Sequence, residues 1–141
     1  MKDVIHLKNK DITKKLFSHA QFIFWAATGA MGDGGAVEIV TDDGKAYYCN
    51  YAYGGADIDR IIKACPILEN AFDLPEGWVF HYLGFGNHLI YKKKYDREYC
   101  VLLAETAERE SSKFPGTQPE DFEHSLWLDI AVKLCSSDSR E

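Results

Sequence analysis

The segment from Gly77 to Tyr95 constrains the fold most, because it is the densest run of strand-forming residues in the chain. Gly84 to Asn87 divide it into two short extended pieces, 78–83 and 88–92, which is the pattern of a β-hairpin with a glycine-containing loop. Successive side chains of a strand point to opposite faces, and both faces of the first piece are largely apolar. We therefore expect this hairpin to be covered on both faces and to form the centre of a sheet.

A second hairpin is predicted nearer the N-terminus. Ala36–Thr41 and Lys45–Tyr53 are rich in strand-forming residues, and Asp42-Asp43-Gly44 between them supplies the Asp-Gly chemistry of a tight turn. In the second of these strands, alternation places a cysteine and three tyrosines on one face: Tyr47, Cys49, Tyr51 and Tyr53.

Four further segments have helical character. Asp11 can cap a short helix. Beyond it, Phe22–Trp25 favours a strand by residue type and a helix by periodicity, and we expect a short helix followed by a strand. Asp57–Phe72 is amphipathic, with a break expected at Pro66 because proline removes a helical hydrogen bond. The last two predicted helices are Tyr95–Ser111 and Pro119–Leu134.

Together these elements predict an α+β fold in one domain, residues 1–134, with a flexible tail at 135–141. The sheet is expected to be mostly antiparallel, with four to five strands that include the two hairpins, packed with three to four helices. In the last helix, apolar residues spaced four apart should face the core: Phe122, Leu126, Ile130 and Leu134.

Composition narrows the class of protein. The chain has 141 residues, the size of one domain, and no run of about 20 apolar residues that would span a membrane. Its cysteines are far apart and form no Cys-x-x-Cys pair, so zinc and redox motifs are not predicted. We expect free thiols in a reducing cytoplasm, at Cys49, Cys65, Cys100 and Cys135.

The formal net charge of −6 bears on the partner. An acidic chain is repelled by phosphate backbones, so nucleic acid is a poor partner, whereas a basic protein is favoured. One segment, Lys92–Glu98, is locally basic, with four bases against two acids.

No catalytic, cofactor-binding or metal-binding residues are predicted. Cys49 and Cys100 could each meet His81 or His88, but no nucleophile signature surrounds them, and apolar neighbours would keep the Cys100 thiol neutral. His81 and His88 lack the tight spacing of zinc ligands. The carboxylates that could pair for acid–base chemistry are expected in turns or on solvated faces: Glu38, Asp42, Asp57 and Asp59.

Two segments, Gly32–Gly44 and Gly77–Leu89, resemble in style the small acidic immunity proteins of bacterial polymorphic and contact-dependent toxin systems. The resemblance covers about half of the chain and includes no diagnostic motif. It implies a cytoplasmic, non-catalytic protein that binds one cognate toxin and blocks its active site or substrate groove.

Such a protein would bind a basic toxin through an acidic and aromatic surface. Buried aromatic anchors supply most of the binding energy of an interface, and an acidic rim steers a basic partner toward it. The expected anchors are Tyr51, Tyr53, Trp78 and Phe85, and the expected rim consists of Asp42, Asp43, Asp57 and Asp59.

Two alternatives remain open from the sequence. One is a small-molecule-binding domain or enzyme, with a pocket between sheet and helices lined by His81, Cys49 and tyrosines, among which a pKa is perturbed. The other is a structural or regulatory homodimer that buries its tyrosine face against itself. If the aromatic rings pack inside and a histidine–cysteine or histidine–carboxylate group lines a solvent-filled hollow, the surface-binding hypothesis is wrong and catalysis takes precedence.

Overall fold

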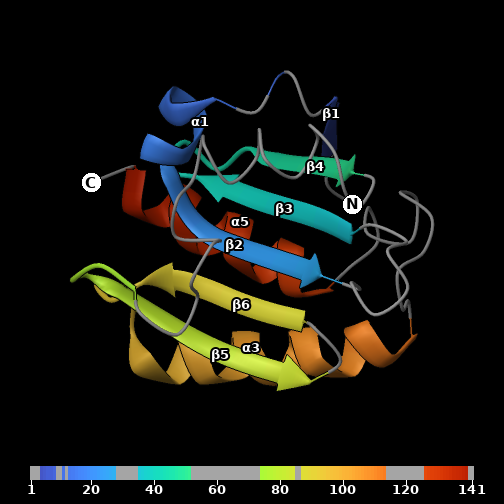
Figure 1. Cartoon of the computed structure of the whole chain (residues 1–141). Coiled ribbons are helices and arrows are strands. Elements are labelled where there is room, and N and C mark those ends of the chain that lie inside the picture. The colour runs from blue at the N-terminus through green and yellow to red at the C-terminus, as the bar shows by residue number, and fades with distance from the viewer. Residues whose placement is uncertain are drawn as a thin grey trace.

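The computed structural model describes residues 4–8, 11, 13–27, 35–51, 74–84, 87–113 and 126–139. These residues form a mixed sheet with strand order β1-β4-β3-β2-β6-β5 (Figure 1). Its strands are β1 (Val4–Leu7), β2 (Ala20–Ala27), β3 (Gly35–Thr41), β4 (Ala46–Tyr51), β5 (Trp78–Gly84) and β6 (Asn87–Lys92). The described helices are α1 (Lys14–Ser18), α3 (Arg97–Lys113) and α5 (Leu126–Ser139). The predicted single α+β domain is confirmed, with six strands in place of the four to five expected.

The sheet differs from the prediction in two respects. The β5–β6 hairpin lies at one edge, because β6 pairs with β2 and β5 ends the sheet; its predicted central position is wrong. Apolar residues on both faces of a strand therefore indicate a sheet that is covered on both sides, and they do not require a central place in it. At the other edge lies β1, which was not predicted. It pairs in parallel with β4, with Val4 opposite Ala46.

The ambiguous segment Phe22–Trp25 lies within β2, after a short helix, as expected. That helix, α1, has only five residues, and its cap is Thr13, whose Oγ1 accepts a hydrogen bond from the backbone N–H of Leu16 at 3.2 Å. The predicted cap, Asp11, lies two residues earlier, and its Oδ2 accepts a hydrogen bond from the backbone N–H of Lys8. The cap prediction was wrong because aspartate and threonine are both favoured at an N-cap, so residue type alone does not decide between them.

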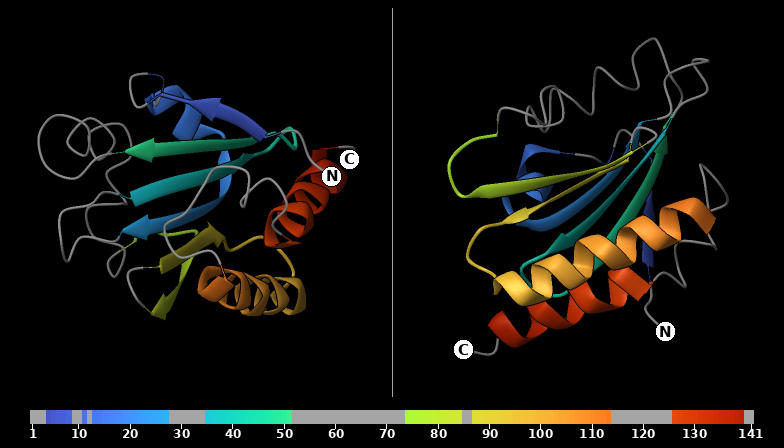
Figure 2. Two further views of the ribbon diagram at one scale, coloured as in Figure 1. Left: turned by 90° about the vertical axis from the view of Figure 1, so that its right-hand side faces the viewer. Right: turned by 90° about the horizontal axis from the view of Figure 1, so that it is seen from below.

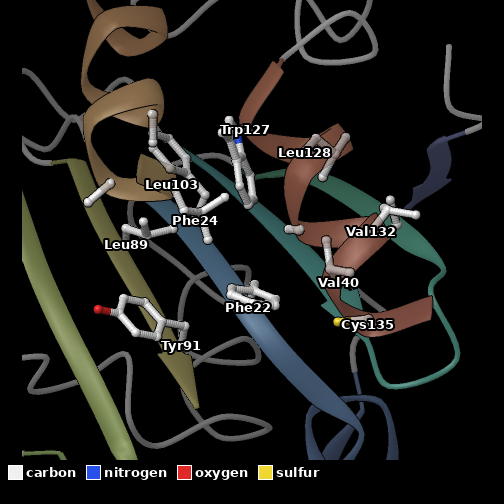
Figure 3. Packing of buried hydrophobic residues seen from close by; sticks show 14 of the residues in the cluster. Phe22, Phe24, Val40, Leu89, Tyr91, Leu103, Trp127, Leu128, Val132 and Cys135 are labelled. Carbon is white, nitrogen blue, oxygen red and sulfur yellow. The ribbon is translucent and has the colours of Figure 1, made fainter. Parts of the chain in front are cut away.

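One face of the sheet packs against α3 and α5, which lie side by side below it in the right-hand view of Figure 2. Alternate residues of β2, Phe22 and Phe24, point into this layer, and Phe24 stacks on Trp127 of α5 with ring centres 5.4 Å apart. Figure 3 shows the cluster: residues of the sheet meet Leu103 of α3 and the buried side of α5.

The opposite face of the same strands forms a second cluster. Ile23 of β2, Ile39 of β3 and Ile90 of β6 are almost completely buried there, and Phe17 of α1 covers part of them. Trp78 is half-buried at the margin of this cluster. Both faces of the sheet are therefore covered, as the apolar alternation predicted.

The predicted core stripe of the last helix is only partly right. Ile130 and Leu134 are half-buried and pack against the core cluster, but Leu126 is 51% exposed. The helix packs on both the sheet and α3, so its buried side is broader than a spacing of four residues suggests and is displaced from the predicted stripe. The helix also continues to Ser139, past the expected end at Leu134. Its buried residues are Trp127, Leu128, Ala131, Val132 and Cys135.

Several sequence predictions lie outside the described residues. They are the helix Asp57–Phe72 with its break at Pro66, the first part of the helix predicted from Pro119, the core residue Phe122 and the hairpin-tip residue Phe85.

The turn between β3 and β4 requires glycine at its end. Gly44 has φ of +79°, a left-handed conformation that costs a residue with a Cβ about 1–2 kcal/mol. A Cβ at this position would also collide with Ser136 Oγ of α5. Gly77, at the start of the β5–β6 hairpin, has φ of +93° but open space around it.

We therefore expect Gly44→Ala to lower the free energy of unfolding more than Gly77→Ala, measured by urea denaturation. Both variants carry the conformational cost, and only the first displaces Ser136. Adding Ser136→Ala should recover part of the difference. Equal losses in the two glycine variants would contradict the contact between the turn and α5.

Candidate functional site

A pocket of about 420 Å³ opens between the β5–β6 hairpin and the first turns of α3. Its volume falls within the range of small-molecule sites, roughly 300–1,000 Å³. The described residues that line it come from one stretch of chain: Val79, His81, Tyr91, Lys93, Tyr95, Arg97, Cys100 and Val101.

The start of α3 sets the geometry of one wall. Asp96 caps the helix, because its Oδ1 accepts hydrogen bonds from the backbone N–H groups of Glu98 and Tyr99, at 2.8 and 3.4 Å. The Asp96 carbonyl oxygen accepts the first helical bond from Cys100 N–H at 3.0 Å. This cap places Arg97 and Cys100 one turn apart on the side of the helix that lines the pocket.

A hydrogen-bonded chain of three side chains crosses the pocket. His81 Nε2 lies 2.8 Å from the Tyr91 hydroxyl, and the two rings stack with centres 5.5 Å apart. The same hydroxyl is hydrogen-bonded to the Cys100 thiol. In Figure 3 the Tyr91 hydroxyl points away from Phe22 and out of the apolar cluster. Tyr91 thus joins the sheet to α3 at the boundary between the core and the pocket.

All three groups are neutral near pH 7. Burial raises the pKa of Tyr91 to about 12, and the neighbouring Cys100 thiol adds to this rise, whereas Arg97 opposes it. Burial likewise raises the pKa of Cys100 and lowers the pKa of His81. Because the thiolate is the reactive form of cysteine, this chain is suited to hydrogen bonding and poorly suited to nucleophilic attack.

Two cations complete the pocket. Lys93 follows β6, and Arg97 is the first residue of α3. Within the described residues neither forms an ion pair with a carboxylate. The adjacent Lys92 lies instead over the Trp78 ring, 4.3 Å from its centre. The charged residues among the described lining are therefore both cations, in a chain whose net charge is −6.

Two of the predicted rim acids stabilise a turn. Asp42 Oδ2 lies 3.3 Å from His19 Nδ1, and Asp43 Oδ1 accepts hydrogen bonds from Thr41 Oγ1 and from the backbone N–H of Lys45. The bond from Thr41 contributes most to lowering the pKa of Asp43. Both carboxylates remain about half exposed, so their role in binding a partner stays a prediction.

The structure describes only part of the predicted aromatic surface. Trp78 lies at the margin of the second cluster, and Tyr51 is the last residue of β4. The side chain of Tyr51 lies outside the described residues, as do four whole residues of the set: Tyr53, Asp57, Asp59 and Phe85.

His81, His88 and Cys49 do not converge. His88 lies on the opposite face of the sheet from His81; its ring stacks on Trp25, and its Nδ1 is 3.2 Å from the Trp25 carbonyl oxygen. Cys49 is buried in the second cluster. The expectation that Cys49 lines a pocket with His81 is therefore wrong, and Cys100 lies at the pocket instead.

The described cysteines agree with the sequence prediction, whereas one carboxylate does not. Three of the four cysteines are described, and all three are buried free thiols, as expected: Cys49, Cys100 and Cys135. Glu38, predicted on a solvated face, is completely buried. It shares the helix-facing side of β3 with Val40, and its register neighbours are Phe24 and Tyr48. The solvated-face prediction was wrong because the sequence shows that side chains of β3 alternate between two faces but does not show which face the helices cover.

Sequence reasoning missed Tyr91, Lys93 and Arg97 as site residues. A signal for Tyr91 was present, because His81 pairs with Leu89 and the residue two positions after Leu89 must share the face of His81. The basic character of Lys92–Glu98 was also visible, but not which of its cations would face a pocket.

Comparisons with protein-family models, curated proteins and solved structures found no match to this chain. Among the described helices, none has the length and apolar character needed to cross a bilayer.

The raised pKa of Tyr91 gives a pH-dependent prediction. Its folded value of about 12 exceeds the ordinary 10.0, so the associated stability is fully present below pH 10 and is lost as the pH rises toward 12. Tyr91→Phe should remove the latest phenolate signal in an ultraviolet titration. It should also cost about 1 kcal/mol at neutral pH, through the lost hydrogen bonds, with a smaller deficit at alkaline pH.

Tyr82→Phe is the matched control, because Tyr82 lies on the same hairpin and is 51% exposed. It should leave the late phenolate signal in place. Survival of that signal in Tyr91→Phe would contradict the assignment.

Proposed function

We propose that this chain is a small-molecule-binding domain whose ligand occupies the pocket between the β5–β6 hairpin and α3. The observation that carries the proposal is that a pocket of about 420 Å³ coincides with the His81–Tyr91–Cys100 chain. Sites for small molecules are typically apolar hollows in which a few polar groups fix the orientation of the ligand.

The pocket offers both kinds of contact. Val79 and Val101 supply aliphatic walls, and Tyr95 supplies an aromatic one. The Tyr95 hydroxyl is held by a hydrogen bond to Gln21 Oε1 at 3.0 Å, so this ring has a fixed position. The almost completely buried Tyr91 and Cys100 form the inner end of the pocket, where Tyr91 provides a hydroxyl. Fixed walls reduce the entropy lost on binding.

Binding is favoured over catalysis because of the protonation states of the chain. A nucleophilic cysteine needs a depressed pKa or an adjacent base that removes its proton. Here burial raises the pKa of Cys100, and its partner is the phenol of Tyr91. His81 reaches the thiol only through that phenol. The side chains therefore suit recognition of a ligand through hydrogen bonds.

A neutral fluorescent probe, N-phenylnaphthylamine, tests the pocket directly. The protein should bind it with increased fluorescence, and Val101→Trp should reduce the affinity by about tenfold or more by filling the mouth of the pocket. Leu102→Trp is the matched control, because Leu102 is the next helical residue with similar exposure, 45% against 42%, and does not line the pocket.

Equal effects of the two tryptophan variants would show that the probe binds elsewhere on the surface. Thermal melts of both variants must resemble that of the parent protein, so that loss of binding is not loss of fold. Absence of any binding to the native protein, with both variants folded, would contradict the proposal.

Binding of a basic toxin is the second candidate, suggested by the resemblance to immunity proteins. The observation that favours it is the β3–β4 turn, which presents Asp42 and Asp43 about half exposed in fixed positions. The hydrogen bond from Thr41 keeps the pKa of Asp43 low, so its charge persists into the acid range. Fixed acidic groups accelerate the capture of a basic partner.

If this second function holds, the source genome should encode a large secreted protein with a variable C-terminal domain immediately upstream. Co-expression of this chain should rescue bacteria that produce that domain. Asp42→Asn with Asp43→Asn should slow association by about tenfold at low salt, and the difference should shrink at high salt. Absence of such a neighbour, or failure to rescue, would contradict this candidate.

A further inference from the structure

We infer that the ligand of the pocket is an organic anion, with an apolar body and one acidic group held between Lys93 and Arg97. The inference rests on the proposed small-molecule function and names the chemical class of its ligand. It depends on the placement of the two cations, on the state of the nearby helix terminus and on the neutrality of the inner end of the pocket.

Both cations are attached to fixed backbone. The Lys93 N–H donates to the Gly77 carbonyl oxygen at 2.8 Å, which closes the base of the β5–β6 hairpin. Arg97 begins α3 directly after the capping residue Asp96. Both side chains line the pocket, and neither is neutralised by an ion pair among the described residues. Two such charges on one pocket favour a ligand of opposite sign.

The helix terminus itself is occupied. Asp96 Oδ1 accepts hydrogen bonds from two backbone N–H groups of the first turn of α3, so these groups are engaged within the protein. An anion in this pocket must therefore be bound by side chains, and among the described residues Lys93 and Arg97 are the charged donors that line it. The carboxylates of Asp96 and Glu98 lie nearby and oppose an anion, but neither lines the pocket.

The inner end of the pocket favours an uncharged body. Tyr91, Cys100 and His81 are neutral near pH 7, because burial raises the first two pKa values and lowers the third. A charged group would lose its hydration there, whereas an apolar ring or chain would gain contact with Val79. The acidic group of the ligand therefore lies at the cationic side and its body at the neutral side.

A pair of probes that differ by one anionic group tests this inference. Anilinonaphthalene sulfonate is N-phenylnaphthylamine with one sulfonate group added. The native protein should bind the sulfonate about tenfold more tightly than the neutral probe, because the sulfonate adds a charge-assisted hydrogen bond that the neutral probe cannot make. Lys93→Gln and Arg97→Gln should each weaken sulfonate binding about five- to twenty-fold and change neutral binding by less than about twofold.

Lys92→Gln is the matched control. It removes the same charge from the adjacent position, but Lys92 lies over Trp78 on the opposite face of the hairpin. It should leave the affinity for both probes within about twofold of the parent. Arg97→Lys keeps the charge and should retain most of the affinity. This result would show that Arg97→Gln weakens binding through the lost charge and not through a disturbed start of α3.

The outcomes separate the two proposals. If both probes bind equally and neither Lys93→Gln nor Arg97→Gln discriminates between them, the anion inference fails while the pocket stands. If Lys92→Gln weakens sulfonate binding as much as Lys93→Gln does, the preference arises from the general field of the protein, and the inference again fails. If the native protein binds neither probe, the proposed function fails as well.

Discussion

The structure depends on one constraint: the middle strands of the sheet are largely apolar on both faces and must be covered on both. Along β2, Phe22 and Phe24 point to one side and Ile23 to the other, and all three are buried. The helices α3 and α5 cover the first side, so the last third of the chain packs against strands that come much earlier in the sequence (Figure 2). Hydrophobic burial of this kind dominates the stability of a small domain.

The pocket exists because this cover is incomplete at one edge. On β5, which ends the sheet, the side chains are half-buried or exposed, whereas those at the middle of β3 are fully buried. Polar groups can therefore lie at the boundary without losing all contact with water. His81, Tyr91 and Cys100 satisfy one another there, which reduces the cost of placing three polar side chains beside the core. The edge position thus makes recognition chemistry compatible with a stable fold.

Alternation along strands was the most reliable sequence signal, because it depends only on the pleat of the backbone. It gave the two faces of the hairpins correctly, including the opposite directions of Val79 and Phe80. It could not give the order of strands, since β1 joins β4 through long-range contacts that leave no local pattern. The site was only partly visible: His81 was suspected, but its link to Cys100 depends on how α3 lies over the hairpin. That placement is set by packing and not by residue spacing.

Among the described residues, those that line the pocket all lie between Val79 and Val101, in the β5–β6 hairpin and the helix that follows it. The far edge, by contrast, depends on Val4 meeting Ala46. Segments of a protein that open independently can differ widely in local stability. Fraying of the N-terminal strand should therefore leave the pocket intact, and amide exchange could be rapid at one edge while the other remains protected. In the proposed function the ligand contacts all lie in this short segment, so changes in specificity could evolve there with little disturbance to the rest of the molecule.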